Sequence, residues 1–256
     1  VLRKQYMTPS RRCIRHSKES PLSLYNAPPF TVGWFILFND SFVLQQAFQS
    51  KQYELQNIWA DSDVDIEDAG NKEIVFRVFT FEENYIVYAP TPEAKKKWID
   101  DINTSVMAFV ERWTHDGVAV CSKNVPVSHE QSVRNVEMYM LHRRELSARY
   151  LEYSYSSSSL QYPGAHFKGF CVNGNPEGAG RLVYPDGRRY TGSFRGGVFE
   201  GNGCMKYPGT VEPGAGHDPI IVTVRGAWKA GKLHGYGEVL YSDGSCYKGE
   251  WFEGER

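Results

Sequence analysis

The chain has 256 residues, which is enough for two domains that each bury a core. The 29 Lys and Arg residues nearly balance the 30 Asp and Glu residues, and a formal net charge of −1 excludes a general attraction to nucleic acid or to an anionic membrane. None of the five cysteines is paired in C-x-x-C spacing, which argues against a zinc ribbon or a disulfide framework and fits a reducing cytosolic setting. Because the net charge is close to zero, any binding site that depends on charge must be a local cluster of charged residues.

Short apolar runs separated by polar or turn-like stretches occupy residues 33–88. They are rich in aromatic and β-branched residues, which is typical of strands. Asn39 and Asp40 both tolerate a left-handed backbone and fit a hairpin turn between the first two runs. The pattern predicts an antiparallel meander whose strands are residues 34–38, 42–44, 53–59, 74–80 and 85–88.

The period of the apolar residues changes at residue 91. Thr91 fits the N-cap of a helix, Pro92 its first position and Glu93 its positive dipole end. The pattern predicts a helix from Pro92 to about Arg112 that covers one sheet, with lysines 95–97 on its solvated side. Its apolar stripe consists of Ala94, Trp98, Ile102, Val106 and Phe109.

Residues 116–160 are mixed in character. They contain a candidate short helix over residues 133–141 and a polar run over residues 154–159. We interpret them as a connection between two domains, the first at 1–115 and the second at 161–256.

A glycine-rich repeat fills the second domain. The aromatic or aliphatic anchors Phe167 and Tyr190 are 23 residues apart, as are Val224 and Tyr247, and the middle interval is lengthened by an 11-residue insertion. Each unit also contains a Gly-x-Gly and a turn such as Pro185-Asp186-Gly187, whose glycine supplies a positive φ. The repeat predicts β-hairpins that stack into an elongated β-solenoid.

The unit from Val224 to Gly244 resembles the MORN repeat, and the resemblance covers about residues 165–256. The meander with its final helix carrying Trp98 resembles a pleckstrin-homology (PH) domain. The order PH then MORN, together with Trp34-Phe-Ile-Leu-Phe-Asn-Asp40 and the start of the helix, resembles the alsin family. The fold expected is mainly β: a PH-like β-sandwich closed by a C-terminal helix, then a MORN-repeat β-hairpin solenoid.

The alsin resemblance implies a non-catalytic targeting and interaction region of a guanine-nucleotide exchange factor. The expected partners of the whole protein are endosomal Rab and Rho-family GTPases, and the expected location is cytoplasmic and peripheral to endosomal membranes. We expect an internal fragment whose first ten or so residues end a Dbl-homology segment, with a Vps-type exchange domain beyond residue 256. Self-association through the MORN repeats is expected as well. The alternative is a scaffold or membrane tether attached to a different enzyme, such as a lipid kinase.

No catalytic constellation, cofactor motif or metal-ligand spacing is evident in the sequence. Gly226-x-x-x-x-Gly231-Lys232 resembles a phosphate-binding loop, but Leu233 replaces the required Ser or Thr and the spacing recurs with the repeat. We therefore predict no enzyme activity, no cofactor and no metal site in this chain. The recurring aromatics of the repeat are expected to form its core rather than a ligand-stacking surface.

Phosphoinositide binding is the specific hypothesis for the PH-like domain, since clustered cations hold head-group phosphates. The candidate residues are Arg11, Arg12, Arg15 and Lys18. The stretch 26–33 before the first clear strand contains no cation, so a solvated basic flank is the competing interpretation of these four residues.

Overall fold

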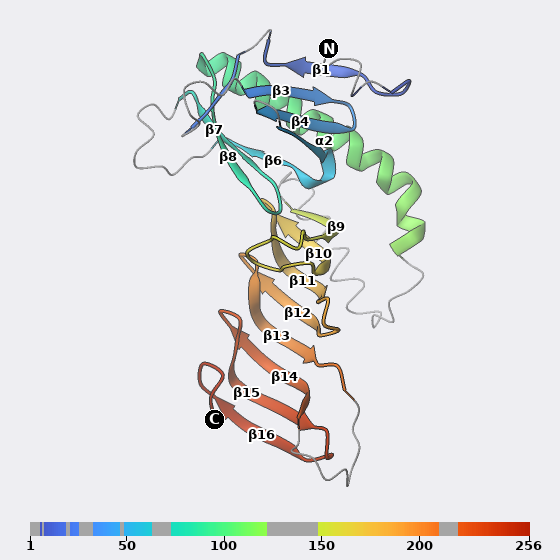
Figure 1. Ribbon diagram of the computed structural model, residues 1–256, viewed down its shortest axis with the longest axis vertical. Coiled ribbons are helices and arrows are strands. Elements are labelled where there is room, and N and C mark those ends of the chain that lie inside the picture. The colour runs from blue at the N-terminus through green and yellow to red at the C-terminus, as the bar shows by residue number, and fades with distance from the viewer. Residues whose placement is uncertain are drawn as a thin grey trace. The chain divides into compact units, whose positions relative to one another are not determined.

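The computed structural model describes residues 6, 8–18, 21–25, 33–46, 49–62, 73–121, 148–209 and 220–256, and at residues 33, 46 and 111–121 it describes the backbone alone. The chain divides into two compact units, Val1–Ser147 and Ala148–Arg256 (Figure 1). Each unit has its own sheet structure, so each is described by itself.

The described residues of the first unit form two antiparallel four-stranded sheets and one long helix. In the first sheet the order is β1 (Cys13–His16), β3 (Gly33–Phe38), β4 (Ser41–Gln46) and β5 (Gln49–Glu54). In the second it is β2 (Ser23–Leu24), β8 (Asn84–Tyr88), β7 (Val75–Phe79) and β6 (Trp59–Asp61). A 3-10 turn, η1 (Leu55–Asn57), joins the sheets, and α2 (Pro92–Cys121) packs against β1, η1 and β6.

The core of this unit lies between the two sheets and the helix. Trp98, Ile102 and Val106 are fully or almost fully buried, with Ala94 and Phe109 packed beside them. They meet apolar residues of both sheets, such as Phe35 on β3 and Phe76 on β7. The apolar stripe predicted for the helix is confirmed, and it closes the sandwich.

The start of α2 is also as predicted. The Ala94 amide donates to Thr91 Oγ1 at 3.2 Å, which makes Thr91 the N-cap, and Pro92 is the first helical residue. The helix continues to Cys121, beyond the predicted end near Arg112.

The strand prediction was wrong in one place and incomplete in others. Residues 53–59 do not form a single strand, because η1 interrupts them at Leu55, whose side chain is fully buried at the turn between the sheets. The strands β1, β2 and β5 were not predicted. The exposed edge strand β5 is almost wholly polar, so it has no apolar alternation from which to predict it.

The described residues of the second unit form one antiparallel sheet of eight strands, and Figure 1 shows these strands following one another from yellow to red. Its neighbours in space are neighbours in sequence, from β9 at one edge to β16 at the other. The strands are β9 (Ala148–Ser154), β10 (His166–Val172), β11 (Asn175–Val183), β12 (Arg189–Arg195), β13 (Val198–Lys206), β14 (Ile221–Lys229), β15 (Lys232–Tyr241) and β16 (Cys246–Trp251). The predicted hairpins are therefore confirmed, arranged side by side in one continuous sheet.

A row of glycines crosses this sheet from β10 to β16. Each glycine is the register partner of the next across neighbouring strands: Gly169, Gly180, Gly192, Gly203, Gly226, Gly237 and Gly249. Aromatic rings lie over the row, and a Cβ on Gly192 would stand 2.6 Å from the Tyr190 hydroxyl oxygen. The repeat therefore needs glycine here because the rings occupy the space of a side chain.

The connection predicted at 116–160 differs from the structure at both ends. Helix α2 continues to Cys121, and β9 from Ala148 pairs along its whole length with β10. Strand β9 precedes the first glycine-containing unit and carries Leu151 where the repeat strands carry glycine, so the 23-residue pattern does not include it. The candidate short helix at 133–141 lies outside the described residues.

Candidate functional site

The four cations predicted to bind lipid separate into two pairs. Arg11 and Arg15 point into the unit, with side chains 13% and 14% exposed. Arg11 Nε and Nη2 donate to the Asp40 carboxylate at 2.8 and 2.6 Å, and its Nη1 donates to the Tyr6 carbonyl at 3.0 Å. These bonds fix β1 onto the turn between β3 and β4, so Arg11 acts as a structural residue.

Arg15 ties β1 to the helix. Its Nε donates to Asp101 of α2, and its guanidinium lies 5.6 Å from the centre of the Trp98 ring. Arg12 and Lys18, by contrast, are exposed. The structure thus places the four residues on the same edge of the unit but leaves only Arg12 and Lys18 open to a ligand.

A second polar cluster joins the two sheets of the first unit. Glu83, in the turn between β7 and β8, accepts hydrogen bonds from Tyr53 at 2.5 Å and from Tyr85 and Lys51, and the two tyrosine hydroxyls are 2.5 Å apart. Burial alone would raise the pKa of Glu83, but hydrogen bonds from Lys51 and the tyrosines lower it below its ordinary value. Burial and the Glu83 hydrogen bond raise the pKa of both tyrosines.

This cluster was missed in the sequence because Lys51 and Tyr53 lie about thirty residues before Glu83 and Tyr85, and the four residues belong to no motif. The alternation of Tyr85 with apolar residues predicts a strand but not a partner for its hydroxyl. With all three hydroxyl and carboxyl groups satisfied by one another, the cluster closes the sandwich and has no vacant position for a substrate.

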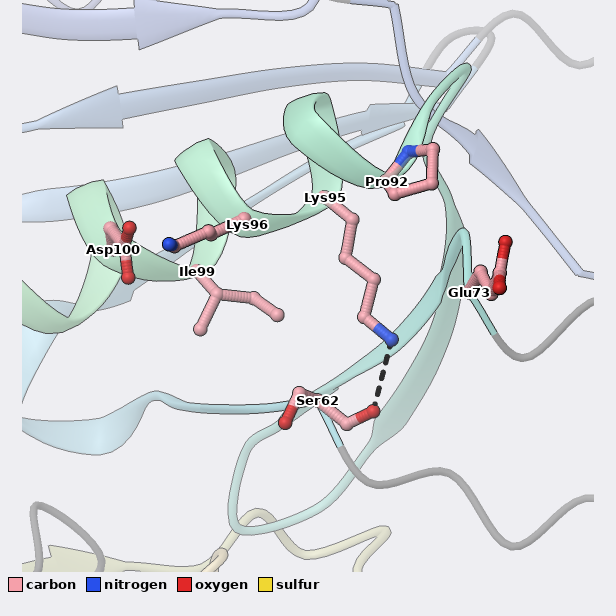
Figure 2. Close-up of a pocket in the computed structure, with 7 residues that line it drawn as sticks. All are labelled: Ser62, Glu73, Pro92, Lys95, Lys96, Ile99 and Asp100. Carbon is pink, nitrogen blue, oxygen red and sulfur yellow. Dashed lines mark hydrogen bonds between the residues drawn. The ribbon is translucent and has the colours of Figure 1, made fainter.

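Figure 2 shows a pocket beside the start of α2. Lys95 extends from the helix and its Nζ donates to the Ser62 carbonyl oxygen at 3.1 Å. Two carboxylates and two ammonium groups share the lining, which gives no preference for an anion. The lining residues are Ser62, Glu73, Pro92, Lys95, Lys96, Ile99 and Asp100. Lys96 and Lys97 are exposed, as predicted for the solvated face of the helix.

The aromatic residues of the repeats are packed as a core. The Tyr190 ring stacks on Phe199 at 3.8 Å between centroids and meets Phe194 and Trp228 edge-on. Tyr190 is fully buried, and burial raises the pKa of its hydroxyl, which donates to the Ser193 carbonyl at 3.0 Å. These rings pack against one another and are buried, which confirms the core prediction for Tyr190, Phe194 and Trp228. Their faces are therefore not available to stack on a ligand.

The segment that resembled a phosphate-binding loop is part of a hairpin. Gly226 lies in β14, Gly231 in the turn and Lys232 at the start of β15, so no helix N-terminus follows the glycines. Among the described residues, no group of three or more His, Cys, Asp or Glu side chains could hold a metal ion. The described helix is not apolar enough to cross a membrane.

Burial shifts the pKa values of two ionisable groups on β9 and β10, at one edge of the repeat sheet. Arg149 of β9 is the register partner of Cys171 of β10, and both side chains are buried. Burial lowers the pKa of Arg149 to about 9 and raises that of the Cys171 thiol well above its usual value. A thiol with a raised pKa is a poor nucleophile, so this pair is structural.

Sequence comparisons match a different family profile in each of the two units. Residues 3–112 match the Alsin PH-like domain profile, and residues 168–188, 190–209 and 225–246 match the MORN repeat profile. Neither profile describes a catalytic domain.

Similar proteins cover nearly the whole chain. Alsin from Mus musculus is 30% identical over 247 residues, which are 94% of this chain and 13% of alsin. Human ALS2 C-terminal-like protein is 25% identical over 255 residues, which are 100% of this chain and 23% of that protein. The chain thus spans less than a quarter of the length of these relatives.

Two solved structures resemble part of the chain. The complex of human RhoA with the DH/PH fragment of PDZRhoGEF gives a TM-score of 0.30 at 16% identity, covering 38% of this chain and 29% of that one. The C-terminal PH domain of human pleckstrin gives 0.31 at 22% identity, covering 41% of this chain and 98% of that one. By the profile matches, a domain similar to the Alsin PH-like domain is followed in this chain by MORN repeats, and the chain is similar to alsin over nearly its whole length.

Proposed function

We propose that this chain is the non-catalytic targeting and interaction region of an alsin-like guanine-nucleotide exchange factor that serves endosomal Rab and Rho-family GTPases. The observation that carries the proposal is the similarity to alsin over 94% of the chain, with the PH-like domain and the repeats in the same order. Exchange activity itself would belong to other parts of the full-length protein.

In this proposal the PH-like unit positions the exchange domains beside the membrane or a neighbouring domain, and the repeat sheet docks partners. The ion pairs of Arg11 and Arg15 support a rigid positioning role, since they tie β1 to the β3–β4 turn and to α2. The protein would lie in the cytoplasm, peripheral to endosomal membranes.

A chimera tests the positioning role. This chain would replace the matching region of mouse alsin, and the location of the chimera on endosomes and its exchange activity on a purified Rab would be measured. We expect both to be retained, and we expect the isolated chain to leave nucleotide release from Rab and Rho GTPases unchanged. Acceleration by the isolated chain would overturn the non-catalytic assignment. Loss of endosomal location in a folded chimera would overturn the targeting role.

Phosphoinositide binding by the cations on and beside β1 is a separate proposal. The structure narrows its test to the exposed cations, because replacing Arg11 or Arg15 would remove an ion pair as well as a charge. We expect the full chain to sediment with phosphoinositide vesicles, and the Arg12→Ala/Lys18→Ala double variant to bind much less. The matched control is Lys96→Ala/Lys97→Ala, which removes two exposed charges elsewhere. Equal binding by both variants would sink the proposal.

Self-association through the repeats is proposed on the same resemblance. The sheet ends at β9 and β16, whose outer edges have no strand partner among the described residues. Light scattering of the full chain over a range of concentrations would test it. A monomer at every concentration would contradict self-association by this chain.

A further inference from the structure

The face of the repeat sheet opposite the aromatic rings carries a group of exposed cations. Side chains alternate between the two faces of a strand, so the neighbours of the buried residues Leu182, Tyr190, Met205 and Val224 point to the other face. Four of these neighbours, on consecutive strands β11 to β14, define the basic face: Arg181, Arg189, Lys206 and Arg225. All four are exposed.

The arrangement places like charges directly opposite one another. Arg189 is the register partner of Lys206, and Arg181 is the partner of Lys168. Opposed like charges on neighbouring strands destabilise a sheet. Nothing in the core of the sheet requires these cations, because their side chains lie on the solvent face.

The row of register partners that contains Arg181 and Arg225 has acidic residues toward both ends. Lys168 forms an ion pair with Glu152 of β9, and Lys248 forms one with Glu238 of β15 at 3.1 Å. Glu238 is opposite Arg225 and lies near its charge. Within the described residues, however, none of the four cations of the basic face forms an ion pair. Acidic residues are thus present on β9 and β15, and none lies between Arg181 and Arg225 in this row.

Other carboxylates of this unit are engaged elsewhere. Glu177 lies four residues before Arg181 on β11 and accepts a hydrogen bond from the Gly196 amide. Glu200 lies four residues before Cys204 on β13 and accepts one from the Ala230 amide. Asp186, in the turn before Arg189, forms an ion pair with Arg188 at 2.6 Å. None of them neutralises the basic face.

We infer that the basic face is a docking site for an acidic, extended segment of a partner protein, an inference that rests on the proposed interaction role of the repeats and specifies its partner. Strands β11 and β14 are three strand spacings apart, about 14 Å, which is the span of about four residues of an extended peptide. The register places the cations in two rows, Arg181 with Arg225 and Arg189 with Lys206, and carboxylates at alternating positions of such a segment would face these cations.

The side chains between the cations suit a peptide. Thr191 and Cys204 separate Arg181 from Arg225 in the row, and Ser193 and Asn202 lie in the next row. Their hydroxyl and amide groups can bond to a peptide backbone. Three of the four cations are arginines, whose planar donors bind carboxylates bidentately.

The test is a binding measurement with the full 256-residue chain. The probe is a fluorescent peptide of about a dozen alternating Asp and Ser residues, long enough to cross four strands, and the control peptide has Asn for Asp. We expect salt-sensitive binding of the Asp peptide alone. The Arg181→Glu/Arg225→Glu variant should bind about tenfold or more weakly, as loss of complementary charge requires.

The matched control variant is Lys96→Glu/Lys97→Glu, which changes the net charge equally but lies on α2 of the first unit. It should bind as the wild type does. Equal weakening by both variants would mean that net charge alone attracts the peptide, and would overturn the inference. Binding to phosphatidylserine vesicles without binding to the Asp peptide would overturn it as well.

A third variant separates binding from folding. Lys206→Thr removes the like-charge pair with Arg189 and introduces a good strand former. The melting temperature of the repeat unit should stay the same or rise while peptide affinity falls severalfold. Wild-type affinity in this folded variant would count against the basic face. If the peptide fails to bind while the alsin chimera still locates to endosomes, the docking inference fails and the proposed function stands.

Discussion

The two units bury their apolar side chains in different ways. The first surrounds its core with two sheets and a helix, so that Trp98 and Phe35 are covered from several sides. The second has a single sheet, and its rings are covered by one another and by the glycine row of the strands beneath them. In the first unit, a second sheet and a helix cover the apolar side chains of the first sheet. In the second unit, the aromatic rings instead pack over strand positions that carry glycine.

This difference changes which substitutions matter. In the sandwich, removing atoms from the core should be the most damaging change, because a cavity remains. In the repeat sheet, adding one carbon to a glycine should be comparably damaging, because the ring above it has nowhere to go.

The largest effect should come from Trp98→Ala. The Trp98 side chain is fully buried among both sheets, and emptying such a site costs about 4 kcal/mol of unfolding free energy. Because the units have separate cores, only the transition of the first unit should move in a thermal melt followed by near-UV circular dichroism. A shift of both transitions by the same amount would show that the units unfold together.

Gly192→Ala should come next, at about 3 kcal/mol from overpacking. The new Cβ would lie 2.5 Å from the Gly203 Cα, a backbone atom that cannot move aside without breaking the ladder. Thr191→Ala, one residue away on the opposite exposed face, is the control and should change the unfolding free energy by less than about 0.5 kcal/mol. Equal effects of the two in urea titrations would disprove the glycine-row argument.

The contrast also explains what the sequence could predict. The 23-residue period shows the hairpins directly, and their turns are visible as glycine pairs or Asp-Gly, so the repeat fold follows from local residues. The helix was equally evident from Thr91, Pro92 and its apolar stripe. Strand β9 was not, because it pairs with the repeat without sharing its glycines.

The candidate sites were harder to predict than the fold. Charge in the sequence located Arg11, Arg12, Arg15 and Lys18, but only the positions of Asp40 and Asp101 distinguish a structural cation from an exposed one. The basic face was missed for a related reason. Its cations are spaced irregularly along the chain and become neighbours only through the register of four strands.

Arg15→Ala should cost about 1.5 kcal/mol, a value typical of a partly buried ion pair with an aromatic contact. Arg15→Ala removes the contacts with both Asp101 and the Trp98 ring. Arg12→Ala removes an exposed side chain and should leave the unfolding free energy nearly unchanged. Arg15→Lys should recover only part of the loss, because lysine lacks the planar fork. Chemical denaturation of the three variants would measure this, and equal stability of Arg15→Ala and Arg12→Ala would refute the structural role.

Glu83→Gln should cost about 1 kcal/mol near neutral pH, after allowing for the partial exposure of its carboxylate. The folded-state pKa of Glu83 lies below its ordinary value of 4.5, so its contribution is present above that pH and is lost as the pH falls through the lower folded pKa. The stability gap between wild type and variant should therefore narrow on acidification. A gap that stays constant down to low pH would show that the charge of Glu83 contributes nothing.

The smallest change in unfolding free energy is expected from substitutions in two turns of the repeat sheet. Asn173-Gly174 and Ala230-Gly231 both have positive φ at the two central positions, as tight hairpin turns require, with φ of 48° at Asn173 and at Ala230. Alanine is strained in this region and asparagine tolerates it. Ala230→Asn should therefore raise the unfolding free energy of the repeat unit by about 0.5 kcal/mol.

The reverse change, Asn173→Ala, is the matched control and should lower stability by a similar amount. Asn173 is a fair counterpart because its own carbonyl accepts a local bond from Asn175, which the variant keeps. Both values can be read from the second unfolding transition in urea. Opposite signs would show that the turns follow intrinsic backbone preference, while two losses would mean that each turn is fixed by its surroundings and that the repeats are less interchangeable than their glycine row indicates.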